Sequence, residues 1–369
     1  MICMVVAMGM GRFALTPQLP HMIAEGQITL TQASLLAAAN FLGYLLGAIE
    51  TISAKRNLIL RLNCGLWGSG VILALSALIP ISPAGIYVNL LLRFAAGIAS
   101  AWTLVLISTW VQEQLGKEHA LRTLAFSGPG VGIMLTGIMA IGLDYYHASA
   151  AFNWLIFGIV ALIASVIIRH NLPSSLPEVS TDTRFPLTSN AYRLIISYTL
   201  CGFGYILPAT FLSTLAVHQF PGSLLADAFW PIFGFAAVAG MALLAVQNNI
   251  RNPQRLLAGI FCIQGLGVLA CTLMPGLAGL LIGAVFVGSS FMAILQLTMR
   301  LGAEIAPQHL RAMTGVLTTG FSVGQLTGPL VSALSTHLWS SMTPALLIAA
   351  FGSFLAAFLA YSIRRTALH

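Results

Sequence analysis

Two arginine side chains lie inside long apolar stretches of the sequence, where a guanidinium can recognise an anion. Arg12 is expected about 17 Å along the first helix, at 1.5 Å per residue, and Arg93 lies at a comparable depth in another. An arginine at mid-bilayer costs at least ~2.5 kcal/mol, so each must face protein or a watery cavity. Two parallel hydrogen bonds from a guanidinium suit a carboxylate. The pair predicts an anion site, although either arginine could instead cross-link neighbouring helices.

Other polar and aromatic side chains in the apolar stretches are candidates to line the same site. The predicted substrate-binding residues, besides the two arginines, are Asn40, Tyr44, Trp102, Tyr205, Trp230 and Gln325. Packing or interfacial anchoring is an equal alternative for any one of them. We assign coupling or gating to Glu50, Pro17, Pro208, Gly328 and Pro329. Pro17, Pro208 and Pro231 are expected to interrupt their helices with local bends.

Glu50 and Asp227 are the acidic residues inside predicted membrane spans, and Asp227 begins its span, where a carboxylate is expected to cap the helix. Glu50 lies about one helical turn from the end of its span and close to Lys55 and Arg56 in the sequence. This position favours a surface ion pair over a role in carrying a proton.

Enzymatic motifs are missing from the sequence. His-Glu-x-x-His, Gly-x-Ser-x-Gly and the glycine-rich phosphate loop do not occur, and the five cysteines lack the paired spacing of metal or disulfide sites. We therefore expect no catalytic residue, no metal site and no cofactor. A polytopic membrane enzyme and a channel are the disfavoured alternatives to a transporter.

The composition identifies the class of protein. Of 369 residues, 58% are apolar and 7% are charged, with a mean hydropathy of +0.93. A water-soluble domain of this size cannot cover so much apolar surface with so few charges. The composition excludes a soluble enzyme, a nucleic-acid-binding protein and a disordered scaffold, and leaves a polytopic membrane protein.

Charges, prolines and polar clusters divide the chain into twelve apolar segments, each near the length of a membrane-spanning helix. The predicted spans are 1–23, 31–53, 58–80, 84–110, 121–143, 150–169, 191–216, 224–246, 256–274, 276–299, 311–337 and 343–363.

Basic residues predict the orientation of these spans. Fourteen of the sixteen follow even-numbered spans, and the other two are the arginines inside spans. Because basic loops stay cytoplasmic, we expect both termini on the cytoplasmic side of a bacterial inner membrane. The fourteen are Lys55, Arg56, Arg61, Lys117, Arg122, Arg169, Arg184, Arg193, Arg251, Arg255, Arg300, Arg311, Arg364 and Arg365.

The longest connection between spans has the proline- and serine-rich composition of a linker. It divides the chain into an N-terminal six-helix bundle at 1–170, a central cytoplasmic linker at 171–190 and a C-terminal six-helix bundle at 191–369. Two bundles of this kind are typical of transporters with parallel repeats.

The run from Gly9 to Pro20, Gly-Met-Gly-Arg-Phe-Ala-Leu-Thr-Pro-Gln-Leu-Pro, closely resembles the first-helix signature of the YbfB/YjiJ group of the major facilitator superfamily (MFS). The resemblance continues through 40–47. Members usually have a longer stretch before this run, so we expect the start at Met1 to be a shortened one. One superfamily motif departs from the pattern, because Thr51 stands where an aspartate is expected. Arg93 to Gly97 resembles a span-4 motif of proton-coupled members.

The resemblance implies an all-α MFS fold with twelve transmembrane helices in two six-helix bundles. It also implies secondary transport of a small organic solute by alternating access, and the arginines favour an anion. A proton-coupled exporter of drugs or metabolites is the alternative. The expected partners are a small-molecule substrate and membrane lipids, without nucleic acid or an obligate protein partner, and we expect a monomer.

Overall fold

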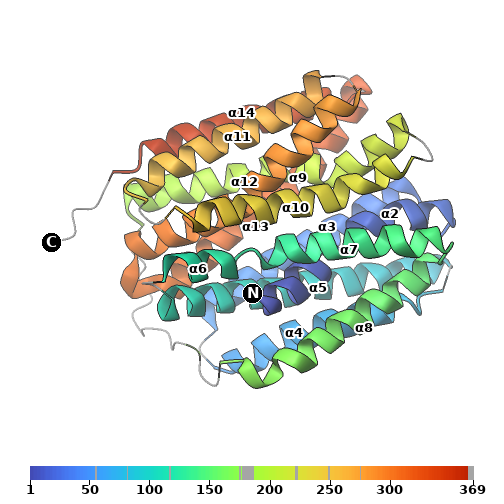
Figure 1. Ribbon diagram of the computed structural model, residues 1–369, viewed down its shortest axis with the longest axis horizontal. Coiled ribbons are helices and arrows are strands. Elements are labelled where there is room, and N and C mark those ends of the chain that lie inside the picture. Colours follow the sequence, from blue (N-terminus) through green and yellow to red (C-terminus); the bar gives the residue numbers. More distant parts are fainter. Residues whose placement is uncertain are drawn as a thin grey trace. The chain divides into compact units, whose positions relative to one another are not determined.

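The computed structural model describes residues 1–54, 56–80, 82–115, 118–173, 176, 187–220, 223–247, 250–274 and 276–364. Figure 1 shows that these ranges are helical, and no strand occurs within them. Ten helical segments of the described chain are long and apolar enough to cross a membrane. They are 2–24, 31–52, 58–76, 84–114, 119–145, 150–171, 227–245, 253–273, 276–305 and 343–361. An all-helical membrane protein is therefore confirmed.

The count of twelve spans is not confirmed and stays a prediction. The predicted seventh and eleventh spans coincide with the long helices α9 (Ser189–Gln219) and α13 (Leu310–Trp339). Neither is among the ten apolar segments. Serine, threonine, glutamine and glycine recur along α13 and lower its mean hydropathy. The helix is therefore long enough to cross a membrane but less apolar than the ten segments.

The structure contains two compact units. Unit 1 comprises Met1–Ile107, Ser127–Leu176 and Thr210–Phe235, and unit 2 comprises Ser108–Phe126, Pro177–Ala209 and Ala236–His369. The predicted bundles at 1–170 and 191–369 stay a prediction. Most of the predicted linker, and the basic residues Lys55, Lys117, Arg184 and Arg365, lie outside the described residues.

Unit 1 is built from the N-terminal helices, and the paired helices α4 and α8 lie side by side in Figure 1. Thr29 and Gln32 form a reciprocal capping box at the start of α3, and Ser149 caps α8. The bounds are α1 (Ile2–Met4), η1 (Val5–Met10), α2 (Leu15–Ala24), α3 (Leu30–Ser53), α4 (Leu58–Ser76), α5 (Pro83–Gln114), α7 (Gly128–Tyr145), α8 (Ala150–Ile168) and η2 (Arg169–Asn171).

The first predicted span is not one regular helix. Segment η1 is a π-helix, and the turn 11–14 separates it from α2. The amide of Gly11 donates to the carbonyl of Val6 at 2.7 Å, five residues back, which is the π pattern. Gly9 lies against Gly132 of α7 so closely that a Cβ on either would overlap the other's backbone. The irregular segment thus packs directly on α7.

The fifth predicted span is divided between two helices in the structure. Helix α6 (His119–Ala125) ends at a turn through Phe126 and Ser127, and α7 starts at Gly128. Pro129 lies in the first turn of α7, where its missing N–H is tolerated, but it cannot continue a preceding helix. Proline chemistry therefore explains this difference from the predicted continuous span.

Helices α3 and α5 cross where glycine residues bring their backbones into direct contact. A Cβ on Gly43 would overlap the carbonyl oxygen of Phe94, and one on Gly97 would overlap the carbonyl oxygen of Asn40. Small residues at such crossings let two helix backbones approach closely in a membrane. This contact fixes the position of the α3 residues that follow Gly43.

Unit 2 contains the remaining helices, among which α11 and α14 lie side by side in Figure 1. Helices α9 and α13 cross at Gly324, where a Cβ would overlap the carbonyl oxygen of Thr199. The bounds not yet given are α10 (Leu224–Ala245), α11 (Pro253–Leu273), α12 (Gly276–Ile305), η3 (Pro307–His309) and α14 (Thr343–Tyr361). Three helices are divided between the units: α5 passes to unit 2 after Ile107, α9 passes to unit 1 at Thr210, and α10 passes to unit 2 at Ala236.

Candidate functional site

Arg12 lies in the turn that follows the π-helix of unit 1. Its side chain is only 3% exposed. The Cζ atom stands 3.7 Å from the centroid of the Tyr44 ring, and 5.3 Å and 5.5 Å from those of Phe13 and Phe41. Aromatic faces attract a cation through their quadrupole, an interaction worth about 2 kcal/mol when desolvated. We call these four residues the Arg12 cluster.

Further aromatic rings of unit 1 extend the Arg12 cluster. Phe13 lies 6.5 Å from Trp230 between ring centroids, and Trp230 stacks on Phe233 at 5.6 Å. The sequence predicted Arg12, Tyr44 and Trp230 as site residues, and the structure brings all three to this region of unit 1. Sequence reasoning missed Phe13 and Phe41. Phe41 precedes Tyr44 by three residues, a spacing that places both on one face of α3.

Several buried polar groups of unit 1 carry atoms with no hydrogen-bond partner among the described residues, and two of these groups belong to Gln18 and Trp230. The atoms concerned are both amide atoms of Gln18, a residue with no exposed surface, and the indole Nε1 of Trp230. A buried polar atom without a partner costs about 1–3 kcal/mol. Water or a ligand is therefore expected at these atoms. Sequence reasoning missed Gln18, whose buried position in α2 has no signal in residue type.

The two mid-span arginines have different neighbours. Arg93 is fully buried, its Nη2 donates to Ser76 Oγ at 2.7 Å, and its Cζ stands 4.6 Å from the Trp154 ring centroid. Asn40 meets only the backbone of this residue, because its Nδ2 donates to the carbonyl of Arg93 at 3.0 Å. The guanidinium thus faces α4 and α8, and a substrate contact from Arg93 or Asn40 stays a prediction.

Glu50 forms the ion pair that its position indicates, but with a different partner. Nε of Arg61 donates to its two carboxylate oxygens at 2.9 Å and 3.1 Å, and Nη2 approaches Oε1 at 2.5 Å. Arg56 contributes only a backbone carbonyl to Arg61, and Lys55 lies outside the described residues. Asn57 has a left-handed backbone conformation, with φ of 58°, and reverses the chain before α4. This reversal brings Arg61 of α4 close to Glu50.

Trp102 forms a hydrogen bond to the carboxylate of Glu50. Its Nε1 donates to Glu50 Oε2 at 2.8 Å. The structure thus brings these two predicted residues together near the end of α3, and a substrate contact from Trp102 stays a prediction.

Unit 2 brings together the other two predicted binding residues. The amide of Gln325 donates to the hydroxyl of Tyr205 at 2.6 Å. The Tyr205 ring stacks on Phe291 at 4.4 Å and lies parallel to Phe321 at 5.5 Å. Gln296 of α12 is fully buried, and neither of its amide atoms has a partner in the described part of the chain. These side chains form a second polar and aromatic cluster.

The predicted gating residues lie in different settings. Pro17 occupies the first turn of α2, and the break in the chain precedes it, at 11–14. Helices α9 and α10 continue through Pro208 and Pro231. Neither helix is interrupted at its proline, and the local bends expected there stay a prediction. Helix α13 likewise includes Gly328 and Pro329, and a Cβ on Gly328 would overlap Ile206 Cγ2.

No group of three or more His, Cys, Asp and Glu side chains in the described ranges is placed to hold a metal ion.

Comparisons with known proteins identify the fold. A family model described as uncharacterised MFS-type transporter YbfB matches residues 4–361. No curated protein matches the chain. The crystal structure of the human organic anion transporter MFSD10 (TETRAN) is 14% identical, with a TM-score of 0.66 and 97% of each chain covered. That of the E. coli fucose:proton symporter FucP is also 14% identical, with a TM-score of 0.66, covering 99% of this chain and 98% of that one.

FucP in the outward conformation is similar as well, at 16% identity and a TM-score of 0.65, with 99% of each chain covered. Likenesses at these identities show the fold alone. The MFS fold and the family resemblance carried by Gly9 to Pro20 are thereby confirmed.

Proposed function

The chain belongs to the family of the uncharacterised MFS-type transporter YbfB, and we infer from this membership and from the Arg12 cluster that it carries a small organic anion. Membership makes the protein an integral membrane secondary transporter and not an enzyme. The nature of the solute is our proposal.

The buried charge of Arg12 carries the proposal. Its guanidinium is 3% exposed and is held against the rings of Tyr44, Phe13 and Phe41. Aromatic rings stabilise a cation without adding a formal negative charge. A carboxylate that reaches this guanidinium therefore gains a charge-assisted interaction in a poorly solvated place, where such interactions are strongest.

The surroundings of Arg12 suit the rest of an organic solute. Trp230 and Phe233 offer stacked aromatic surface, and Gln18 and the Trp230 indole offer polar atoms without partners among the described residues. Ligand sites are commonly apolar, with a few well-placed polar groups. The human organic anion transporter with the same fold supports the proposal by analogy only.

We further propose transport by alternating access, with the two predicted six-helix bundles moving against each other. The charge distribution of the loops supports an orientation with both termini cytoplasmic, and we propose a bacterial inner membrane as the location. No direct use of ATP is expected, because the sequence has no phosphate-binding loop.

Counterflow in proteoliposomes tests the proposal. We expect vesicles loaded with an unlabelled monocarboxylate to accumulate the same labelled compound transiently, as carriers do, and to ignore amines of similar size. A panel of aliphatic and aromatic carboxylates, with matched amines and neutral sugars, should include at least one carboxylate that exchanges. Exchange of amines or sugars alone would contradict an anionic substrate, and leakage without counterflow would contradict a carrier.

The alternative, a proton-coupled exporter, depends on a carboxylate that exchanges a proton. Glu50 is half-exposed and bound by Arg61 and Trp102, which favours a structural role. We expect Glu50→Gln to change counterflow and proton-driven uptake by less than about threefold, because exposed ion pairs contribute little.

Glu304→Gln is the matched control for Glu50→Gln, since Glu304 is also half-exposed and paired, with Arg300 at 2.9 Å. Loss of proton-driven uptake in Glu50→Gln alone would support the exporter.

A further inference from the structure

Three acidic residues lie on the side of the membrane that the loop charges assign to the outside, and all three belong to unit 1. They are Glu25 after α2, Asp144 near the end of α7 and Asp227 in the first turn of α10. The loops predicted to face outward contain no lysine or arginine. A histidine is therefore the only kind of side chain in these loops and span ends that can gain a positive charge.

His21, near the end of α2, interacts with two of these carboxylates. Its Nδ1 stands 3.6 Å from Oδ1 of Asp144, and both side chains keep contact with solvent, at 20% and 51% exposure. Asp227 interacts electrostatically with both His21 and Asp144. A protonated imidazole attracts both carboxylates, whereas a neutral one leaves two like charges to repel each other. The protonation of one histidine thus changes the sign of the net interaction in this group.

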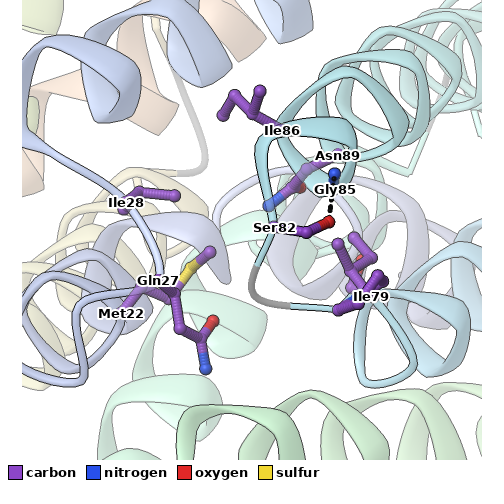
Figure 2. Close-up of a pocket in the computed structure, with 10 residues that line it drawn as sticks. Met22, Gln27, Ile28, Ile79, Ser82, Gly85, Ile86 and Asn89 are labelled. Carbon is purple, nitrogen blue, oxygen red and sulfur yellow. Dashed lines mark hydrogen bonds between the residues drawn. The ribbon is translucent and has the colours of Figure 1, made fainter.

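Glu25 lies one helical turn from His21, but its carboxylate is bound elsewhere. Its Oε1 accepts from the amide of Ala150 at 2.7 Å, and its Oε2 accepts from Gln27 Nε2 at 2.8 Å. Figure 2 shows Gln27 beside a cavity of about 20 Å³, enough for one water, which needs roughly 10–15 Å³. Glu25 therefore serves the start of α8, and the other two carboxylates are the partners of His21.

The remaining ionisable side chains near His21 are those of Tyr145, Tyr146 and His147, in and after the last turn of α7. All three are exposed and take part in no ion pair among the described residues. The first two turns of α3 and α8, which also pack on α2, contain no ionisable side chain. The charge of His21 is thus opposed by Asp144 and Asp227.

Helices α7 and α10 are in direct contact just inward of these two carboxylates. A Cβ on Gly137 would overlap Pro231 Cδ, and one on Gly234 would overlap the backbone of Met134. The two carboxylates lie about two and one helical turns further out on α7 and α10. Helices α2 and α7 belong to the N-terminal predicted bundle and α10 to the C-terminal one. The contact therefore joins the two predicted bundles on the outer side.

We propose that His21 binds a proton from the outer side and, with Asp144 and Asp227, forms an outer latch between the two predicted bundles. At acidic pH the imidazolium holds both carboxylates, and the outer side stays closed. At alkaline pH the neutral imidazole releases them, and their repulsion favours the outward-open state. The latch rests on the alternating access proposed above and is independent of the nature of the solute.

Distances between spin labels test the outer latch in the purified full-length chain in lipid nanodiscs. The five cysteines are replaced by alanine, and labels are attached at Leu78→Cys and Leu338→Cys. Both leucines are exposed at outer helix ends, one in each predicted bundle. Raising the pH from about 5.5 to about 8 removes the histidine proton, and we expect the distance distribution to shift to longer distances. Labels at Leu78→Cys and Phe152→Cys, within one predicted bundle, should show no shift.

Two substitutions of His21 should fix the latch in opposite states. His21→Arg keeps a positive charge throughout this pH range, so we expect the short distances at both pH values. His21→Gln carries no charge, so we expect the long distances at both. A folding defect does not produce these opposite results. His147→Asn is the matched control, because His147 is exposed and its left-handed backbone, with φ of 53°, suits asparagine; it should shift with pH as the wild type does.

The label distances and counterflow fail separately. Carboxylate counterflow with a distance distribution that does not change with pH would overturn the latch and leave the proposed solute standing. A pH-dependent shift that is lost in His21→Gln supports the latch even where no carboxylate exchanges. A shift that persists in His21→Gln, or a closing of the outer side as the pH rises, would also overturn the proposal.

Discussion

Replacement of Arg12 by glutamine is expected to weaken substrate binding about 100-fold or more and to abolish counterflow at micromolar substrate. A hydrogen bond to a charged group contributes about 1.5–3 kcal/mol, and each 1.4 kcal/mol is a factor of ten in affinity. Two such bonds from one guanidinium account for the expected loss. The measurement is counterflow in proteoliposomes, with binding of the best carboxylate followed by thermal shift.

The conservative variant Arg12→Lys separates charge from geometry. Lysine keeps the positive charge but lacks the planar fork that matches a carboxylate, so we expect a loss of about tenfold, from one lost charged hydrogen bond. Arg255→Gln is the control, because Arg255 is exposed and only lies over the Tyr361 ring at 5.7 Å. Retained binding in folded Arg12→Gln would refute the assignment of this residue to substrate.

Alanine at Gly43 is expected to cause the largest loss of stability among single methyl additions in unit 1. The new Cβ would overlap the carbonyl oxygen of Phe94, which belongs to the backbone of α5 and cannot rotate away. Overpacking of this kind costs about 1–3 kcal/mol or more. We expect the thermal midpoint of the purified protein to fall by about 5 °C or more.

Gly68→Ala provides the comparison for Gly43→Ala. Gly68 lies within α4, and no atom stands within 4 Å of the position that its Cβ would take. Alanine also favours a helix over glycine by about 0.5–1 kcal/mol, so the midpoint should stay the same or rise. Equal destabilisation by both substitutions would show that the α3–α5 crossing is not closely packed.

The burial of Arg12 could be predicted from the sequence, because a charge within an apolar span is stable only where it faces protein or a watery cavity. The proximity of Tyr44 to Phe41 on α3 could also be predicted, since helical spacing defines which residues share a face. The contact between Phe13 and Trp230 was not, because it joins residues more than 200 positions apart and no local pattern encodes the packing of distant helices.

The direction of a side chain was harder to predict than its burial. Arg93 and Arg12 have the same residue type and a similar expected depth, yet Arg93 bonds Ser76 on α4. Hydropathy reports that a residue is inside the membrane and carries no information on which neighbouring helix it faces. The partner of Glu50 was missed for a related reason, because the turn at Asn57 brings in Arg61 from the next helix.

The π-helix Val5–Met10 alters the angular phase of the first span. A turn with i→i+5 bonding accommodates one residue more than an α turn, and one α-helical residue corresponds to about 100° of rotation and 1.5 Å of rise. A helical wheel drawn continuously from Ile2 to Ala24 therefore assigns the residues before Val5 to the wrong side by roughly that angle. Deleting one residue from this segment would restore regular α-helical phase. The side chains before Val5 would then turn by about 100° relative to those after the segment.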